Sequence, residues 1–412
     1  MSDIETRVRQ AMHGEAERAR PEQLRPIIVN AMQRRAPQRS WIAPAVAALA
    51  IATTIAGVAV AVRASGLFGT TDDGSRPMSS TFAKPPWPGV GNRMPAYYVA
   101  IYFGKSLNSS GTAIRMTAVV RSSATSGLLR TVPLPNLNGA SDGGPVITAA
   151  GDDRHFVIAL PAGASGVTRF YLLTLGATGR AASLARLPIH PVPAKESVSG
   201  IALTPDGTRL AMTVQFPYRP TRYCRGRKPT GEVKVVNLVT GSVRTWTTRQ
   251  HVPLGDGPSE PSWGDGGRLL GFLWDERNGV PDRGLYVLNT TAPGSNLMAA
   301  RRLFRGTGLG LDAYLTAPGR TVIADMDAGP PSPGAPLNDG YPSIVEYSAR
   351  TGHLIRTLYG PPRTATPAGY GVVSADPSGK YLLVAAPHFG RLVNGKFTRL
   401  AMKPGAAPIA AW

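Results

Sequence analysis

Residues 215–231 carry the side chains of this sequence that are best suited to hold an anionic ligand. Five cations and two tyrosines lie within this short stretch: Arg219, Arg222, Arg225, Arg227, Lys228, Tyr218 and Tyr223. Guanidinium groups donate paired hydrogen bonds to carboxylate and phosphate oxygens, and they stack on aromatic faces. The stretch therefore predicts a site for an anionic or glycan ligand, formed by Arg219, Arg222, Tyr223, Arg225, Arg227 and Lys228. The alternative, which this composition indicates more often, is a solvated arginine-rich surface loop.

Carboxylates and histidines predict no metal site. Asp152 and Asp153 are adjacent, and Asp325 and Asp327 are one residue apart, so either pair could contribute to a calcium site or line a channel. We favour the simpler interpretation, in which the first pair lies in a turn and the second ends a strand. The histidines are scattered, and no two share the spacing of metal ligands: His13, His155, His190, His251, His353 and His388.

Motifs of common catalytic centres provide no candidate either. The sequence contains no H-E-x-x-H motif, no C-x-x-C motif and no phosphate-binding P-loop. No catalytic residue and no cofactor is predicted, although residues gathered from separate parts of a fold would escape this search. Cys224 is the only cysteine, which excludes an internal disulfide and a cysteine-rich metal site. It could pair with a second chain, but an incidental thiol is the more common case.

A turn in residues 203–214, which read L-T-P-D-G-T-R-L-A-M-T-V, organises the chain. Pro205 presets the backbone angle of the first corner, and Gly207 accepts the positive φ that closes the hairpin loop. Related copies begin at Ala149, Trp263, Leu315 and Ala375. Each copy has a Pro/Asp/Gly turn, then Arg or Lys, then an apolar strand. The predicted turn residues are Asp152, Asp206, Gly207, Asp265, Gly319 and Gly379.

A second hairpin follows the first, with turns such as Thr240-Gly241, Thr351-Gly352 and Asn394-Gly395. Each unit is therefore four strands in two hairpins. A sheet this small cannot bury both of its faces alone, so it must stack on its neighbours. Radial stacking predicts an all-β fold, a β-propeller over residues 94–412. A string of separate small domains is disfavoured, because no linker-like stretch divides the copies.

The turn pattern resembles the WD40-like repeat of TolB-type extracytoplasmic propellers, whose blades carry a W-S-P-D-G turn. The resemblance rests on residues 203–207 (L-T-P-D-G) and 263–267 (W-G-D-G-G), and it covers roughly residues 94–412. It implies a propeller outside the cytoplasm and says almost nothing about activity. The G-H and W-D signatures that recur in intracellular WD40 repeats do not recur here, since each dipeptide occurs once, at residues 352–353 and 274–275.

The first blade lacks an innermost strand. Strands are predicted over residues 96–103, 113–121 and 128–134, and no Pro/Asp/Gly turn precedes them. The chain ends in P-I-A-A-W, which resembles an earlier innermost strand, E-P-S-W. We therefore predict that the C-terminal strand, with Ile409 and Trp412, completes the first blade. Innermost strands are expected near residues 149, 203, 263, 315, 374 and 412, which predicts six blades.

The formal net charge is +20, while hydrophobic residues make up 42% and charged residues 17% of the 412 residues. These proportions suit a protein with a packed core. The positive charge could attract anionic polymers or lipid head groups at a cell surface. The simpler explanation is an arginine-rich composition encoded by a GC-rich genome. Nucleic acid is not predicted as a partner, because most of the charge follows the predicted membrane segment described next.

Residues 41–62 contain no charged residue and would span about 33 Å as a helix, enough for a hydrocarbon core of about 30 Å. More arginines precede this segment than follow it, which places the N-terminus in the cytoplasm. We predict a helical cytoplasmic tail (1–40), an uncleaved single-pass anchor (41–62), a Gly/Ser/Pro-rich tether (63–93) and a propeller outside the cytoplasm. A cleaved signal peptide is the competing interpretation. Within the tether, P-P-W-P at residues 85–88 is expected to pack against the first blade.

Three functions are compatible with this organisation. The leading hypothesis is a non-catalytic binding or sensing module for a ligand or protein outside the cytoplasm. The second is a transmembrane regulator, because Ile4, Val8 and Met12 recur at helical spacing in the tail, which could bind a cytoplasmic protein such as a sigma factor. The third is a propeller hydrolase of the lactonase or glycosidase kind.

Overall fold

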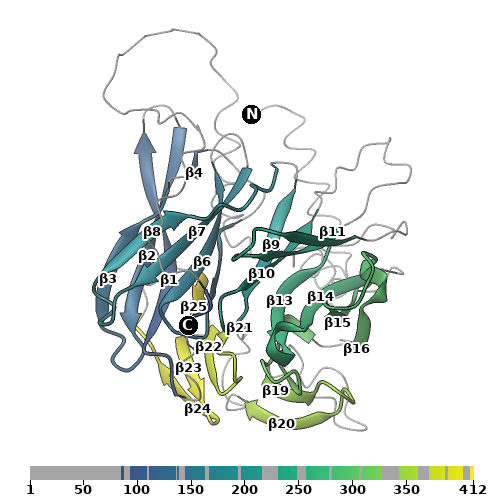
Figure 1. Cartoon of the computed structure of the whole chain (residues 1–412). Coiled ribbons are helices and arrows are strands. Elements are labelled where there is room, and N and C mark those ends of the chain that lie inside the picture. Colours follow the sequence, from purple (N-terminus) through teal and green to yellow (C-terminus); the bar gives the residue numbers. More distant parts are fainter. Residues whose placement is uncertain are drawn as a thin grey trace, which may run out of the picture. The chain divides into compact units, whose positions relative to one another are not determined.

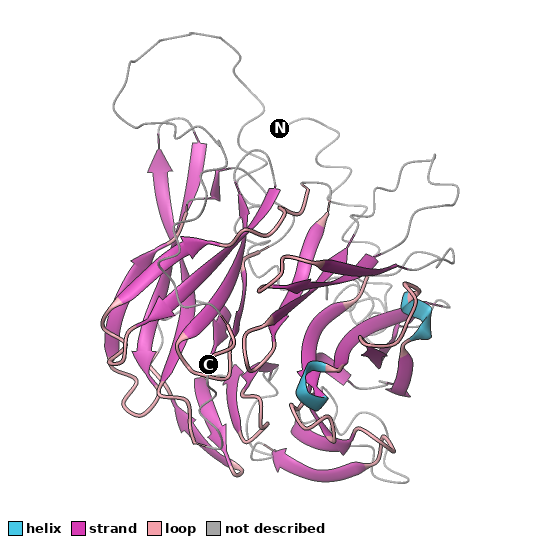
Figure 2. Ribbon diagram, viewed as in Figure 1, coloured by secondary structure: helices cyan, strands magenta, loops and turns pink. Residues whose placement is uncertain are grey.

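The computed structural model describes residues 85–87, 93–108, 111–135, 137–138, 144–162, 167–193, 196–215, 231–247, 257–277, 281–305, 309–326, 343–360, 371–385, 388–401 and 409–412. Within these ranges the regular secondary structure is almost entirely β-strand, with two single-turn 3-10 helices, η1 (Asp265–Gly267) and η2 (Leu297–Ala299) (Figures 1 and 2). The predicted tail, span and most of the tether lie outside them, as does Cys224. No helix in the described part is long and apolar enough to cross a membrane.

The strands form six antiparallel sheets, which are the predicted blades. Blade 1 contains β1 (Tyr97–Asn108), β2 (Gly111–Ser122), β3 (Leu128–Pro133) and β25 (Ile409–Ala411), with β4 (Leu137–Asn138) paired to β2. Blade 2 contains β5 (Val146–Ala149), β6 (His155–Ala162), β7 (Val167–Leu175) and β8 (Ala182–Arg186). Blade 3 contains β9 (Ser197–Leu203), β10 (Arg209–Gln215), β11 (Gly231–Asn237) and β12 (Val243–Thr247).

The second half of the ring repeats this arrangement. Blade 4 contains β13 (Ser259–Gly264), β14 (Leu269–Arg277), β15 (Pro281–Asn289) and β16 (Arg301–Arg305). Blade 5 contains β17 (Leu309–Leu315), β18 (Thr321–Met326), β19 (Ser343–Ser348) and β20 (Leu354–Tyr359). Blade 6 contains β21 (Gly371–Ala375), β22 (Tyr381–Ala385), β23 (Phe389–Val393) and β24 (Lys396–Arg399).

In blade 3, burial is greatest in the first two strands and lowest in the outer strand. Strands β9 and β10 are apolar and mostly buried. Side chains of strand β11 alternate in burial: Val233 and Val235 enter the core, while Glu232 and Lys234, which precede them, are only partly covered. The outer strand β12 buries Trp246 alone. The run of apolar residues after each predicted turn is therefore the second strand of a blade.

The inner strands form a closed ring. Each contacts the inner strands of the two adjacent blades, in the order β5, β9, β13, β17, β21, β25 and back to β5. Strand β25 supplies the missing inner strand of blade 1 by pairing Val99 with Ala411 and Ile101 with Ile409. Trp412 follows directly, is 3% exposed, and meets the ring of Tyr98 edge-on at 6.5 Å between centroids. The predictions of six blades and of C-terminal closure are confirmed.

The hydrophobic core is divided among the gaps between blades. Each of six clusters of buried residues draws its members from two adjacent blades. The gap between blades 3 and 4, for example, is filled by Trp246 from one side and Trp263, Phe272 and Trp274 from the other. No blade is thus buried by its own residues, as the repeat length predicts.

The turns have the predicted backbone geometry. Gly207 has φ +71°, its N–H donates to the Thr204 carbonyl at 2.8 Å, and the Thr204 N–H donates to the Arg209 carbonyl at 2.9 Å. Gly319 and Gly379 repeat this geometry with φ +68° and +73°. The turn of blade 4 differs, because Asp265 itself has positive φ, at +46°, within the single turn of η1.

The N-terminal segment packs elsewhere than predicted. Trp87 is 5% exposed and belongs to the core cluster between blades 2 and 3 rather than to blade 1. Its N–H donates to the Asp206 carbonyl at 2.7 Å, and its ring lies against Gly207. The expectation of a contact with the first blade is therefore wrong. A bare glycine in the turn of blade 3 provides the space that the indole fills.

Candidate functional site

The ring has two faces, which the strand order defines. The turn face carries the five turns between the first and second strands of blades 2–6, at residues 150–154, 204–208, 265–268, 316–320 and 376–380. The loop face is the opposite one, where each second strand ends and the third strand begins. The segments that join β10 to β11 and β18 to β19 leave from this face. The predicted ligand-binding residues, from Arg219 to Lys228, all belong to the first of these segments and lie outside the described residues.

The two ends of the basic segment are held firmly. Gln215, at the end of β10, is buried, and its Nε2 donates to the Gly257 carbonyl at 3.1 Å. At Gly231, where β11 begins, a Cβ atom would lie only 2.5 Å from Pro258 Cδ. Lys234 Nζ lies 2.9 Å from the Glu232 carboxylate and 3.5 Å from Glu196. The segment therefore starts and ends on a rigid part of the loop face.

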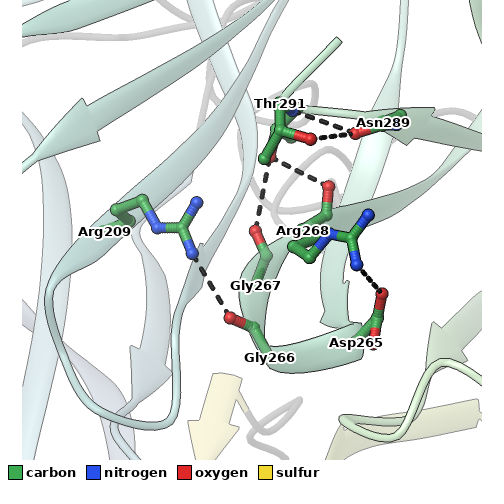
Figure 3. A network of polar contacts seen from close by, with 8 residues as sticks. Arg209, Asp265, Gly266, Gly267, Arg268, Asn289 and Thr291 are labelled. Atoms are coloured by element: carbon green, nitrogen blue, oxygen red, sulfur yellow. Dashed lines mark hydrogen bonds and ion pairs between the residues drawn. The ribbon is translucent and has the colours of Figure 1, made fainter.

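On the turn face, neighbouring turns hydrogen-bond to each other. The Gly151 N–H of blade 2 donates to the Pro205 carbonyl of blade 3 at 2.8 Å. Arg209 of blade 3 reaches the Gly266 carbonyl of blade 4 at 3.3 Å, as Figure 3 shows. The Ala317 N–H of blade 5 donates to the Pro377 carbonyl of blade 6 at 2.7 Å. The turn residues Asp152, Asp206, Gly207, Asp265, Gly319 and Gly379 lie within or beside these contacts.

Arginine side chains add a second set of contacts between blades. Arg244 of β12 stacks over the Trp246 ring at 4.5 Å and donates to the Thr290 and Gly294 carbonyls of blade 4, at 2.7 and 2.9 Å. It also reaches the carbonyl of Ala292. Arg301 of blade 4 donates to Ala349 of blade 5 at 3.2 Å, and Arg391 of blade 6 donates to the Ser123 carbonyl of blade 1. Part of the arginine content thus joins adjacent sheets.

A buried carboxylate–imidazole pair lies where Trp87 enters the propeller. His155 Nδ1 and Asp152 Oδ2 are 2.5 Å apart, and Asp152 Oδ1 accepts the backbone N–H groups of Arg154 and His155. Burial acts to raise the pKa of Asp152, but these hydrogen bonds outweigh it and hold the pKa below its usual range. The imidazole stacks on Trp87, with 3.9 Å between centroids and 4° between planes.

The adjacent acid, Asp153, has a different environment. Its backbone has φ +56°, and its Oδ2 accepts the Ala96 N–H of blade 1 at 2.8 Å. Burial raises the pKa of this carboxyl above its usual range, although the hydrogen bond from Ala96 opposes the shift. Asp152 therefore positions His155 within blade 2, whereas Asp153 links blade 2 to blade 1. Both are turn residues, as predicted.

A histidine held by a carboxylate can act as a general base, but this one is enclosed. His155 is 7% exposed, and the Trp87 ring covers one face of the imidazole. Its Nε2 has no hydrogen-bond partner among the described residues. The Asp152–His155 pair therefore packs against Trp87 and forms its binding position, which we call the seat of Trp87. Sequence reasoning missed it, although the i, i+3 spacing of Asp152 and His155 and the lone tryptophan of the tether were visible.

Asp325 and Asp327 form the second acidic pair, and Asp325, its described member, has a structural role. Asp325 is 1% exposed in β18, and its Oδ1 accepts the Asp312 N–H at 2.8 Å, where β17 is irregular. Asp327 lies outside the described residues. Within the described ranges, no three His, Cys, Asp or Glu side chains are grouped as metal ligands would be.

The sequence also contains one match to a motif of hydrolases. Residues 139–143 read G-A-S-D-G, which matches the G-x-S-x-G pattern of nucleophile elbows. An elbow joins a strand to a helix, whereas the next element here is the strand β5. The whole segment lies outside the described residues. The pattern therefore lacks the structural context that gives it meaning.

No protein-family model matches the chain, and no curated protein matches it. Similar solved structures include the β-propeller domain of the Trilobed protease from Pyrococcus furiosus, with 10% identity over 78% of this chain and 84% of that chain, and a TM-score of 0.44. The Pyrococcus horikoshii acylaminoacyl peptidase shows 11% identity over 75% of this chain and 44% of that chain, with a TM-score of 0.44.

A third similar structure is the periplasmic gluconolactonase of Pseudomonas aeruginosa, with 13% identity over 74% of this chain and 95% of that chain, and a TM-score of 0.39. Identities and TM-scores this low carry no inference about activity. The TolB-type resemblance stays a prediction. What the strand pairing and the ring of inner strands establish is the architecture: this chain contains a six-bladed β-propeller closed by its C-terminal strand.

Proposed function

We propose that this protein is a binding module whose recognition surface is the loop face. The observation that carries the proposal is a structural difference between the two faces. The turns of one face hydrogen-bond to each other, so several of their backbone polar groups already have partners. The two long second-to-third strand connections, at residues 216–230 and 327–342, both leave from the other face. Loops carried on a rigid scaffold are the usual location of binding residues.

The proposed ligand is anionic. The connection at residues 216–230 holds Arg219, Arg222, Arg225, Arg227 and Lys228 beside Tyr223, and it contains no acidic residue. Multiple guanidinium groups favour carboxylate, sulfate or phosphate groups. The tyrosines suit a sugar ring or a planar group, so an acidic glycan is the class that fits both kinds of side chain.

The test uses the full chain and dextran sulfate as an anionic glycan probe. A variant with Arg219, Arg222, Arg225, Arg227 and Lys228 changed to glutamine should bind at least about tenfold more weakly at moderate salt. The matched control removes five cations from the turn face, where all five side chains are exposed: Arg180, Arg320, Arg350, Lys380 and Lys396. An equal loss in both variants would show a response to net charge alone and contradict the proposal.

We further propose that the propeller lies outside the cytoplasm behind a single-pass anchor. The support is the uncharged stretch at residues 41–62 and the excess of arginine before it. Protease added to intact cells should remove the propeller and leave a short membrane-bound fragment. Protection of the whole chain would contradict this topology.

The regulator is a second candidate, which rests on the apolar spacing of Ile4, Val8 and Met12 in the tail. A pull-down with the full chain and with a variant carrying Ser at these three positions discriminates between the two functions. A cytoplasmic partner lost specifically in the variant would favour the regulator.

A further inference from the structure

The turn face carries a ring of positive charge. Each turn between the first and second strands of blades 2–6 ends in a basic residue: Arg154, Arg209, Arg268, Arg320 and Lys380. Arg209 turns sideways onto the Gly266 carbonyl and over Trp263, at 5.3 Å from the ring centroid. The other four side chains are exposed. Because second strands sit at similar distances from the centre, these cations encircle the middle of the face.

Three more cations extend the ring outward. The exposed residues Arg180, Arg350 and Lys396 lie in or beside the turns between third and fourth strands, which open on the same face. Seven exposed cations therefore occupy these turns: Arg154, Arg180, Arg268, Arg320, Arg350, Lys380 and Lys396.

The acidic residues of the same turns do not neutralise this charge. Asp152, Asp153 and Asp376 are buried and accept backbone N–H groups. Among the described acidic residues of these turns, only Asp206 and Asp265 are exposed. Asp206 bonds to Thr204 and Thr208, and Asp265 lies 3.5 Å from Arg268. The carboxylates build the turns while most of the cations face solvent.

The N-terminal end of the propeller chain lies on this face. Trp87 is bonded to the turn at Asp206, and β1 starts at Tyr97 beside Ala96, which is bonded to the turn of blade 2. Residues 63–84 separate Pro85 from the predicted anchor. A chain of that length can span at most roughly 75 Å at full extension. An anchored propeller would therefore be attached to the bilayer from its turn face.

We infer that the turn face docks on the anionic lipid head groups of the bilayer that carries the anchor. Clusters of lysine and arginine are attracted to anionic lipid surfaces, and the attraction acts within about 8 Å at physiological salt. The loop face, with its basic insertion, then points away from the membrane. This inference concerns the opposite face from the proposed ligand site and requires only the predicted anchor.

The experiment places a dye on either face of the full chain in proteoliposomes. Cys224→Ser removes the native thiol, and Thr178→Cys or His190→Cys introduces one label site. Both residues are exposed and belong to blade 2, the first on the turn face and the second on the loop face. Energy transfer to a head-group-labelled lipid reports the distance of each dye from the membrane.

The dye at residue 178 should transfer more in vesicles with about one-third phosphatidylglycerol than in pure phosphatidylcholine, since only the former attracts cations. The dye at residue 190 should transfer less and show no such difference. Salt at about 1 M should abolish the gain, because screening then acts within about 3 Å. Equal transfer from both faces, or no response to lipid charge, would overturn the inference.

Variants distinguish the effect of the turn-face cations from the effect of the total charge of the protein. Glutamine at Arg154, Arg268, Arg320 and Lys380 should reduce the transfer in anionic vesicles to the phosphatidylcholine level. Glutamine at Arg219, Arg222, Arg225 and Arg227, the matched control, should leave it unchanged. If energy transfer falls as much in the control as in the first variant, the inference is overturned. It is also overturned if a charged polymer such as dextran sulfate binds the turn face while the lipids have no effect. The salt series on the wild-type sequence tests the inference even where the first variant does not fold.

Discussion

At the scale of the residue, the turn glycines perform two different tasks. Gly207 and Gly241 have nearly the same backbone angle, with φ +71° and +75°. A Cβ on Gly207 would lie 2.0 Å from the Trp87 ring, whereas a Cβ on Gly241 would meet nothing within 4 Å. The first glycine therefore serves both the turn and the seat of Trp87, while the second serves the turn alone.

This pair permits a matched test. Gly241→Ala should lower the free energy of unfolding by about 1–2 kcal/mol, the cost of a left-handed residue with a side chain. Gly207→Ala should cost about 1–3 kcal/mol more, because the methyl group displaces the indole. Denaturant titration of both variants measures the difference. Equal losses would mean that Trp87 does not depend on this contact.

At the scale of the element, arginine joins sheets that share no strand pairing. Arg244 spans three carbonyls of the neighbouring blade and lies on its own blade's Trp246. Arg356 also sits on an outer strand but is 65% exposed and pairs with Glu346 inside its own sheet. Both are arginines of outer strands, and only the first connects two blades.

The two positions should therefore respond differently to lysine. Arg244→Lys keeps the charge but loses the planar fork, and it should lower the free energy of unfolding by about 1–3 kcal/mol. Arg356→Lys, the control, should change it by no more than about 0.5 kcal/mol. The midpoints of urea unfolding provide the comparison, and indistinguishable midpoints would refute the role of Arg244 as an interblade contact.

At the scale of the whole molecule, the ring depends on a contact between the two ends of the propeller chain. Only three residue pairs join β25 to β1, but Ala410 of this strand and Trp412, which follows it, also enter the core between blades 6 and 1. Removing it would leave the edge of β1 unpaired and an apolar gap open. Closure is thus a packing event as well as a strand pairing.

Deletion of residues 409–412 should lower the melting temperature of the propeller by at least about 5 °C, because burial of a tryptophan alone contributes about 3–5 kcal/mol. Trp412→Phe, which keeps the strand and most of the ring, should lower it by less. Differential scanning calorimetry of the full chain measures both changes. A deletion variant that melts like the wild type would show that blade 1 is complete without β25.

Much of the architecture follows from the sequence, because its signals are local. The turn at residues 203–214 and its copies specify φ angles through Pro and Gly, and the apolar runs after them specify second strands. Counting the copies predicted six blades. The first blade has no Pro/Asp/Gly turn and no inner strand before it, which predicted the closing strand at Ile409 and Trp412. Each of these inferences needs only residue types and their order along the chain.

The tertiary structure alone decided how the blades are joined and where Trp87 lies. The partners of Gly151, Arg209, Arg244 and Arg391 are backbone carbonyls of another blade. Every residue carries a carbonyl, so residue types cannot tell which carbonyl is near. The seat of Trp87 likewise requires a glycine and a histidine brought together from two blades. The sequence determined the repeated unit and its number, whereas long-range packing decided which residues join adjacent blades and where Trp87 lies.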